Sequence, residues 1–146
     1  MSCIKKLAIL EPLVDMCESK QVMSSSATLL TIDLYTVTPA QLDFMSHFEL
    51  NFRRQDTTHA LVCYFDIEFK CTHTKIRFST GPTAEYTHWK QTVFYLEQGV
   101  KVDNNQRLKG EMRVKKNDKN PRDIDITIDW MVVGKTKRKT QEYRLR

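Results

Sequence analysis

The sequence predicts an all-β protein, built as an antiparallel β-barrel or a distorted sandwich. Apolar and polar residues alternate with a period of two over many short segments, which is typical of strands with one buried face. Turn residues separate these segments at short intervals, and few segments have the pattern of a helix. The 146 residues fit one domain, and a domain of this length buries roughly 70% of the surface that its unfolded chain exposes.

The clearest alternation lies in residues 60–69 and 122–132. In the first segment the residues expected to face the core are Leu61, Cys63, Phe65, Ile67 and Phe69. In the second they are Ile124, Ile126, Ile128 and Trp130, and the residues expected to face outward are Asp123, Asp125, Thr127 and Asp129. A slip of one residue would bury aspartates, so we expect the register of this second strand to be strongly fixed.

Other segments predict further strands and a few short helices. Strands are expected at residues 30–35, 48–53, 70–77, 92–96 and 108–114. The 92–96 strand is apolar on both faces, so we place it centrally. Thr38 before Pro39 predicts an N-cap and the start of one short helical turn. Short helices are otherwise expected only within residues 2–10 and 18–23.

The net charge of +5 is unevenly distributed. Residues 1–73 carry six Lys/Arg against nine Asp/Glu, a net of −3, and residues 74–146 carry seventeen against nine, a net of +8. The most basic part is residues 134–146. Such a segment can meet nucleic acid or an acidic partner, but no basic helix or aromatic RNA-binding signature accompanies it. We therefore favour a solvated hairpin and tail over a surface that binds nucleic acid.

Four cysteines are present, at positions 3, 17, 63 and 71, and no two form a C-x-x-C pair. Cys71 and His73 are the only close pair of zinc-ligand type, and two further ligands at suitable spacing are missing. We therefore expect reduced thiols and no metal. No apolar run approaches the ~20 residues that a membrane span needs, and the first ten residues do not resemble a signal peptide. These observations predict an intracellular protein without a membrane segment.

The most informative stretch is residues 78–97, in which a Gly-Pro loop is followed by Tyr86, Thr87, His88 and Trp89 and then by an apolar strand. Loops at the rim of a rigid β-structure often carry function. By spacing alone the signal is weak, since a single histidine beside a tryptophan is more often a structural hydrogen-bonding residue than a catalyst.

The sequence THWKQTVFYLE at 87–97 resembles the THW loop of protein arginine N-methyltransferases. Four other segments resemble the type I members of that family: EPLVD, DLYTV, HALVCYFDIEF and KNPRDIDITID. The first five residues, MSCIK, resemble part of the family's dimerisation arm. The resemblance implies an arm remnant over residues 1–25 and a C-terminal β-barrel domain over 26–146.

The resemblance also implies a chemistry. These enzymes transfer a methyl group from S-adenosylmethionine to a guanidinium nitrogen of arginine, and type I members make asymmetric dimethylarginine. An N-terminal Rossmann-like half holds the donor and two glutamates, and the barrel completes the substrate cleft. The catalytic residue expected here is His88, paired with an acid of that half. Tyr86, Thr87 and Trp89 are expected to bind substrate, with Trp89 shaping the arginine channel.

The same resemblance implies partners and a location: arginine-rich proteins such as histones or RNA-binding proteins, a homodimer or a heterodimer with a family member, and the cytoplasm and nucleus. The chain also departs from the family pattern. Its four glycines are isolated, no G-x-G motif occurs, and no Rossmann domain or paired-glutamate loop is present. The basic C-terminal end and Ser19, where a proline is expected, are further departures.

We therefore expect the chain alone to be inactive, to need no cofactor of its own and to contribute substrate cleft and dimer contacts. The alternative is a short isoform that acts as a non-catalytic interaction or regulatory module of a full-length methyltransferase. A basic nucleic-acid-binding barrel is a third, weaker hypothesis. In the first two cases the surface that faces the donor-binding half should be apolar and exposed, which predicts poor solubility or self-association.

Overall fold

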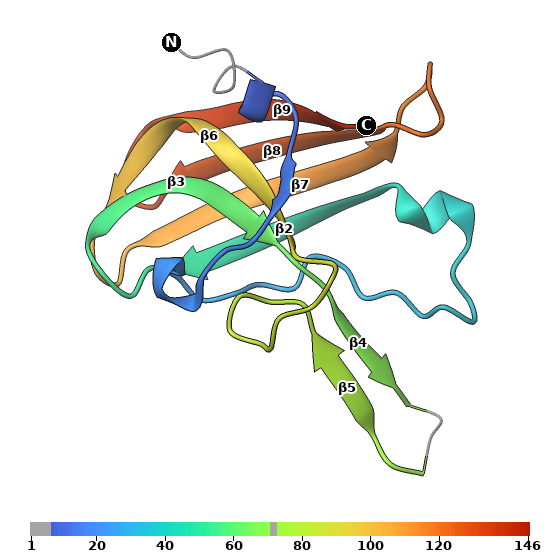
Figure 1. Cartoon of the computed structure of the whole chain (residues 1–146). Coiled ribbons are helices and arrows are strands. Elements are labelled where there is room, and N and C mark those ends of the chain that lie inside the picture. Colours follow the sequence, from blue (N-terminus) through green and yellow to red (C-terminus); the bar gives the residue numbers. More distant parts are fainter. Residues whose placement is uncertain (1–6, 71–72) are drawn as a thin grey trace.

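The computed structural model describes residues 7–70 and 73–146, and its regular structure in these ranges is β-strands and two short 3₁₀ helices (Figure 1). The strands are β1 (Leu13–Asp15), β2 (Phe44–Asn51), β3 (Asp56–Cys63), β4 (Asp66–Phe69), β5 (Ile76–Ser79), β6 (Gln91–Val102), β7 (Arg107–Lys116), β8 (Ile124–Val132) and β9 (Arg138–Leu145). The helices are η1 (Ser19–Gln21) and η2 (Pro39–Leu42). All strand pairs are antiparallel, so the predicted all-β antiparallel class is confirmed.

The strands form three sheets in the described ranges. The order is β1-β6-β3 in one sheet and β2-β7-β8-β9 in a second, and β4 and β5 form a separate hairpin that projects from the body (Figure 1). The core contains side chains from both larger sheets, including Leu61, Phe94, Leu108, Ile128 and Trp130. No single sheet closes on itself across residues 7–70 and 73–146, so the architecture is the distorted sandwich rather than a closed barrel.

The gap between the two larger sheets is bridged by side chains where β6 and β9 approach each other. The hydroxyl of Tyr143 and the amide nitrogen of Gln141 donate hydrogen bonds to the Tyr95 carbonyl, at 3.0 and 2.9 Å. The Arg144 backbone N–H donates to the Leu10 carbonyl at 2.9 Å. These bonds replace the backbone ladder that a closed barrel would have at this edge.

The register predicted for β8 is confirmed on its core face, where Ile126, Ile128 and Trp130 are buried. Of the residues predicted to face outward, Asp129 on β8 and Asp123 directly before it are nevertheless buried. Asp129 is covered by Arg113, Arg138 and Thr140, which pair or hydrogen-bond with its carboxylate. Asp123 accepts a hydrogen bond from the Asn120 side chain at 2.7 Å. Alternation predicts the face of the sheet on which a side chain lies. It does not predict whether long neighbouring side chains cover that side chain.

Several predicted strands differ from the observed ones. Residues 30–35 form no strand, and Leu34 and Tyr35 are more than four-fifths exposed. The segment predicted as one strand at 60–69 is divided into β3 and β4, and Phe65 and Phe69, predicted to face the core, are 42% and 50% exposed. The 48–53 strand is displaced to 44–51, and the end of the 70–77 strand corresponds to the start of β5. For residues 30–35 and for Phe65 and Phe69, an apolar alternation was taken as burial against this chain.

Other elements agree with the expectations. The 92–96 strand lies within β6, which is central in its sheet, and the 108–114 strand lies within β7. The helical turn after Thr38 is confirmed as η2, with the Thr38 N–H bonded to the Gln41 side chain at 2.8 Å. The 18–23 region holds η1. Of the helix predicted at 2–10, residues 7–10 lie within the described residues, where Leu7 and Ala8 are helical and a turn follows. The proposed boundary near residue 25 stays a prediction.

Candidate functional site

The loop between β5 and β6 begins from a firmly held base. Thr80 is 1% exposed, and its hydroxyl and backbone N–H both donate to the Phe65 carbonyl, each at 3.0 Å. The Phe65 N–H in turn donates to the Thr80 hydroxyl at 3.1 Å. The buried Gln91 side chain donates to the Thr80 carbonyl at 2.8 Å and accepts from the Cys17 N–H at 2.8 Å. Both ends of the loop are therefore fixed relative to the three-stranded sheet.

Within this loop the four predicted site residues lie in and beside one turn. The Lys90 N–H donates to the Thr87 carbonyl at 3.3 Å, and Lys90 has a φ of 54°, in the left-handed region. This turn directs His88 and Trp89 outward, and Tyr86 beside it is 67% exposed. Among the residues that the structure describes, His88 makes no hydrogen bond or ion pair, and the buried Thr87 hydroxyl has no hydrogen-bond partner.

Trp89 belongs to an aromatic cluster with Phe65 and Phe78, which we call the Trp89 cluster. The Trp89 ring stacks on Phe78 with centroids 5.8 Å apart, and it meets the edge of Phe65 at 6.0 Å. Trp89 is nevertheless 57% exposed. Aromatic side chains that pack together yet face solvent are typical of surfaces that another protein or domain covers. Alternation did not reveal Phe65 and Phe78 as site residues, because an apolar side chain on a strand is expected to face the core.

The β4–β5 hairpin extends this apolar surface. Phe69 and Ile76 pair across the hairpin, and each is at least half exposed. An ion pair of 2.9 Å joins Arg77 to Asp66. The pKa of Asp66 is lowered by a hydrogen bond from Ser79 and by Arg77. A two-stranded hairpin by itself is marginally stable in water, so these polar contacts support a hairpin whose apolar residues are half exposed.

The predicted site residues alone cannot carry out methyl transfer. An arginine guanidinium is protonated at all ordinary pH values, so a site that activates it needs carboxylates to bind the cation and a group that accepts a proton. Tyr86, Thr87, His88 and Trp89 supply no carboxylate. Their side chains instead present an exposed imidazole and exposed aromatic rings.

The described residues do not fit S-adenosylmethionine. Donor cradles of Rossmann type use a glycine-rich loop that leads into a helix, and the glycines here serve the β-structure instead. A Cβ at Gly110 would lie 2.4 Å from the Phe48 ring, and Gly134 has a φ of 89° in the β8–β9 turn. Across residues 7–70 and 73–146 no group of three His, Cys, Asp or Glu side chains is placed to hold a metal. Cys71 lies outside the described residues, so its pairing with His73 is not described.

Among the same residues, no helix has the length and apolar character of a transmembrane segment. The fold and the loop define a β-rich domain with an exposed aromatic surface, of the kind that works against a second domain or subunit. The sequence model of the arginine methyltransferase oligomerization subdomain matches residues 1–135. The chain therefore belongs to the protein arginine methyltransferase family, whose members depend on S-adenosylmethionine, and corresponds to its C-terminal part.

The similarity to curated relatives agrees with this family assignment. The chain is 43% identical to protein arginine N-methyltransferase 1 of Chlamydomonas reinhardtii over 148 aligned positions, which cover 100% of this chain and 43% of the relative. It is 46% identical to protein arginine N-methyltransferase 8-B of Danio rerio, over 88% of this chain and 31% of the relative. The chain thus spans less than half the length of these relatives.

Solved structures show the same fold. The Trypanosoma brucei PRMT1 enzyme-prozyme heterotetrameric complex with AdoHcy contains a chain that matches 97% of this one, with a TM-score of 0.91 and 34% identity. The match covers 45% of that chain. Protein arginine methyltransferase 10 of Arabidopsis thaliana matches with a TM-score of 0.86 at 16% identity, over 93% of this chain and 42% of its own, which shows the fold alone.

Proposed function

We propose that this chain serves as the barrel part of an enzyme that transfers methyl groups from S-adenosylmethionine to arginine residues of proteins. In this role the chain contributes one wall of the substrate cleft and the contacts between subunits, and it has no activity alone. The observation that carries the proposal is the Trp89 cluster, in which Trp89 of the THW loop packs on Phe65 and Phe78 and is still 57% exposed, more than a self-contained domain would leave it. A donor-binding half packed on this cluster would cover it.

The position of His88 supports the same role. His88 is exposed and free of partners among the described residues, and it directly precedes Trp89 in the chain. An acidic residue of the donor-binding half would pair with it and thereby fix the loop against the cleft. His88 would then act by positioning and electrostatics, while the carboxylates that bind the guanidinium come from the other half.

The test is a fusion in which residues 1–146 replace the matching segment of the Chlamydomonas enzyme. We expect the fusion to transfer tritiated methyl groups from S-adenosylmethionine to an arginine-rich peptide. His88→Ala and Trp89→Ala should each lower kcat/KM on the order of 10-fold or more, because both act on the alignment of substrate. Thr83→Ala, in an exposed part of the same loop, is the matched control and should leave kcat/KM unchanged. Equal activity of all four fusions would contradict the proposed site.

A second candidate function is a non-catalytic partner of a full-length family member. The matched subdomain is named for oligomerization, and the Trypanosoma brucei relative was solved as an enzyme-prozyme complex. Co-expression with a tagged full-length methyltransferase distinguishes the two candidate functions. A stable complex in which the short chain alters the activity of its partner supports the second candidate, and failure to co-purify argues against it.

A further inference from the structure

Three hairpin connections meet at one end of the molecule. The register places Asn51 opposite Arg107, Asp56 opposite Val102 and Leu108 opposite Val132. The β2–β3, β6–β7 and β8–β9 connections therefore lie together, at the left in Figure 1. We call residues 51–56, 101–107 and 132–139 the basic end.

The basic end carries more positive charge than the whole chain. It holds eight Lys/Arg against two Asp, a net of +6, whereas the full chain has a net charge of +5. The cationic residues come from all three connections: Arg53, Arg54, Lys101, Arg107, Lys135, Lys137, Arg138 and Lys139. Positive charges that are spread over almost ninety residues of sequence therefore lie together at one surface.

Much of this charge is not neutralised within the chain. Arg107 pairs with Glu49 at 3.0 Å, Arg54 with Asp56 at 3.6 Å and Arg138 with Asp129 at 3.8 Å. In the described ranges no carboxylate pairs with the other five cations of the basic end. Lys135 instead donates from Nζ to the Lys101 carbonyl at 2.7 Å, which brings the β8–β9 turn against β6.

A surface cavity of about 450 Å³ lies within the basic end. Lys101 and Lys135 line it together with Asp56, Asp103 and the polar side chains of Gln55 and Thr57. The cavity therefore offers cations, acceptors and small polar groups side by side. Such a mixture suits a partner that itself presents both carboxylates and N–H donors.

We propose that the basic end binds an acidic, extended segment of a partner protein. Carboxylates of the segment would meet the unpaired lysines, and its backbone N–H groups would find acceptors in Asp56 and Asp103. A nucleic acid fits less well, because none of the large exposed apolar residues in the described structure is an aromatic of these three connections, so bases have nothing to stack on.

This surface is distinct from the THW loop. Residues 91–100 of β6 separate the loop from the basic end, and at about 3.3 Å per residue these ten residues correspond to up to about 33 Å of strand. A cationic surface also repels arginine-rich proteins. The proposal therefore concerns a different partner from the methylation substrate and does not depend on the proposed function.

The experiment measures binding of a fluorescein-labelled, Glu- and Asp-rich peptide to the 146-residue chain by fluorescence anisotropy. The variant Lys101→Gln/Lys135→Gln/Lys137→Gln removes three charges from the basic end. The matched control is Lys116→Gln/Lys119→Gln/Arg122→Gln, which removes three charges from the end of β7 and the β7–β8 turn, at the opposite end of the molecule (Figure 1). Circular dichroism checks that both variants are folded, and an RNA and a duplex DNA of equal total charge are the competing probes.

We expect the basic-end variant to weaken peptide binding at least about tenfold, the control to change it less than about twofold, and binding to weaken with added salt. Equal losses in the two variants would mean that only net charge matters and would overturn the proposal. Absence of peptide binding at low ionic strength, or tighter binding of either nucleic acid than of the peptide, would overturn it as well.

Discussion

Gly110 shows how one residue determines the packing of the four-stranded sheet. It lies between Phe48 on β2 and Trp130 on β8, directly opposite both in the register. A Cβ at this position would lie 2.4 Å from Phe48 Cζ and 2.6 Å from the Asp129 carbonyl oxygen. The second contact is with backbone, which cannot move away as a side-chain terminus can. Glycine is therefore required here by close approach.

Gly110→Ala is accordingly expected to lower the free energy of unfolding by about 1–3 kcal/mol, the cost that is typical of overpacking in a core. Urea denaturation, monitored by circular dichroism, measures this change in the free energy of unfolding. Thr136→Ala, at an exposed turn position, is the control and should stay within about 0.5 kcal/mol of the wild type. A Gly110→Ala protein as stable as the control would show that β7 and β2 are not packed as described.

The thiol of Cys63 packs against the core, and burial raises its pKa to about 11. Since the thiolate is the reactive form, we expect Cys63 to react with iodoacetamide on the order of 100-fold more slowly than an exposed thiol at neutral pH. The measurement uses a chain in which the other three cysteines are replaced by serine. Unfolding in urea should restore the ordinary rate. Fast modification of the folded protein would contradict the placement of Cys63.

At the scale of elements, Gln141 on β9 joins three segments. Its side chain donates to the carbonyls of Ile9 and Tyr95, each at 2.9 Å, and accepts from the Glu97 N–H at 3.0 Å. Gln141→Leu should lower the free energy of unfolding by about 1–2 kcal/mol, because these groups lose their partner. The Glu97 amide should also exchange with deuterium faster, while Lys137→Ala leaves its rate unchanged. An unchanged Glu97 rate in Gln141→Leu would show that the bridge does not form.

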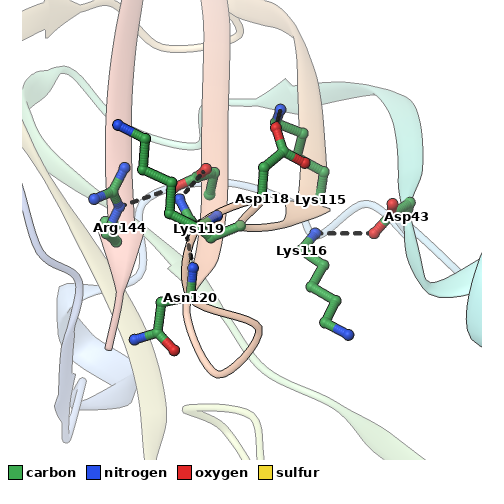
Figure 2. A network of polar contacts seen from close by, with 9 residues as sticks. Asp43, Lys115, Lys116, Asp118, Lys119, Asn120 and Arg144 are labelled. Carbon is green, nitrogen blue, oxygen red and sulfur yellow. Dashed lines mark hydrogen bonds and ion pairs between the residues drawn. The ribbon is translucent and has the colours of Figure 1, made fainter.

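The β7–β8 turn is a second element that polar contacts hold in place (Figure 2). The Asn117 side chain accepts from the N–H groups of Lys119 and Asn120 at 2.9 Å and donates to Asp125 at 2.7 Å. Asp125 also accepts from Arg144 on β9 at 2.9 Å, and the Asp43 carboxylate accepts from the Lys116 N–H at 2.9 Å. Side chains of Asn and Asp that bond to nearby backbone replace secondary structure in such turns.

The pKa of Asp125 is lowered, chiefly by its hydrogen bond with Arg144 and then by that with Asn117. A carboxyl with a lower pKa in the folded state stabilises the protein above its unfolded pKa of about 3.9, and this contribution is lost as the pH falls through the folded pKa. Asp125→Asn should therefore reduce stability at pH 7 and flatten the loss of stability below about pH 4. Parallel pH profiles of melting temperature for the two proteins would contradict this.

The elements also show how far the sequence could predict the fold and the site. Alternation identified β6, β7 and β8, because these strands are buried against this chain. It failed for residues 30–35 and for Phe65, where the apolar side chains are exposed in this structure. Periodicity reports that a face is apolar, but not which partner covers it. The THW loop was found from its residues, whereas Phe78 and the cationic surface depend on contacts between distant segments.

At the scale of the whole molecule, two surfaces lie far apart on one body: the apolar surface around Trp89 and the basic end. We expect the isolated chain to self-associate through the apolar surface around Trp89, because association removes exposed aromatic side chains from water. Trp89→Ser together with Phe65→Ser should shift the chain towards monomer in sizing chromatography. A monodisperse wild-type monomer would contradict this expectation.

The most direct test of the central claim is methyl transfer by the purified 146-residue chain alone, with tritiated S-adenosylmethionine and an arginine-rich peptide. The chain is interpreted as the barrel part of an arginine methyltransferase, with the donor site elsewhere. No label above background is the predicted result, since the described residues form no donor cradle and the four predicted site residues supply no carboxylate. Incorporation of label into peptide arginine would contradict the account, because it would require a donor site within this chain.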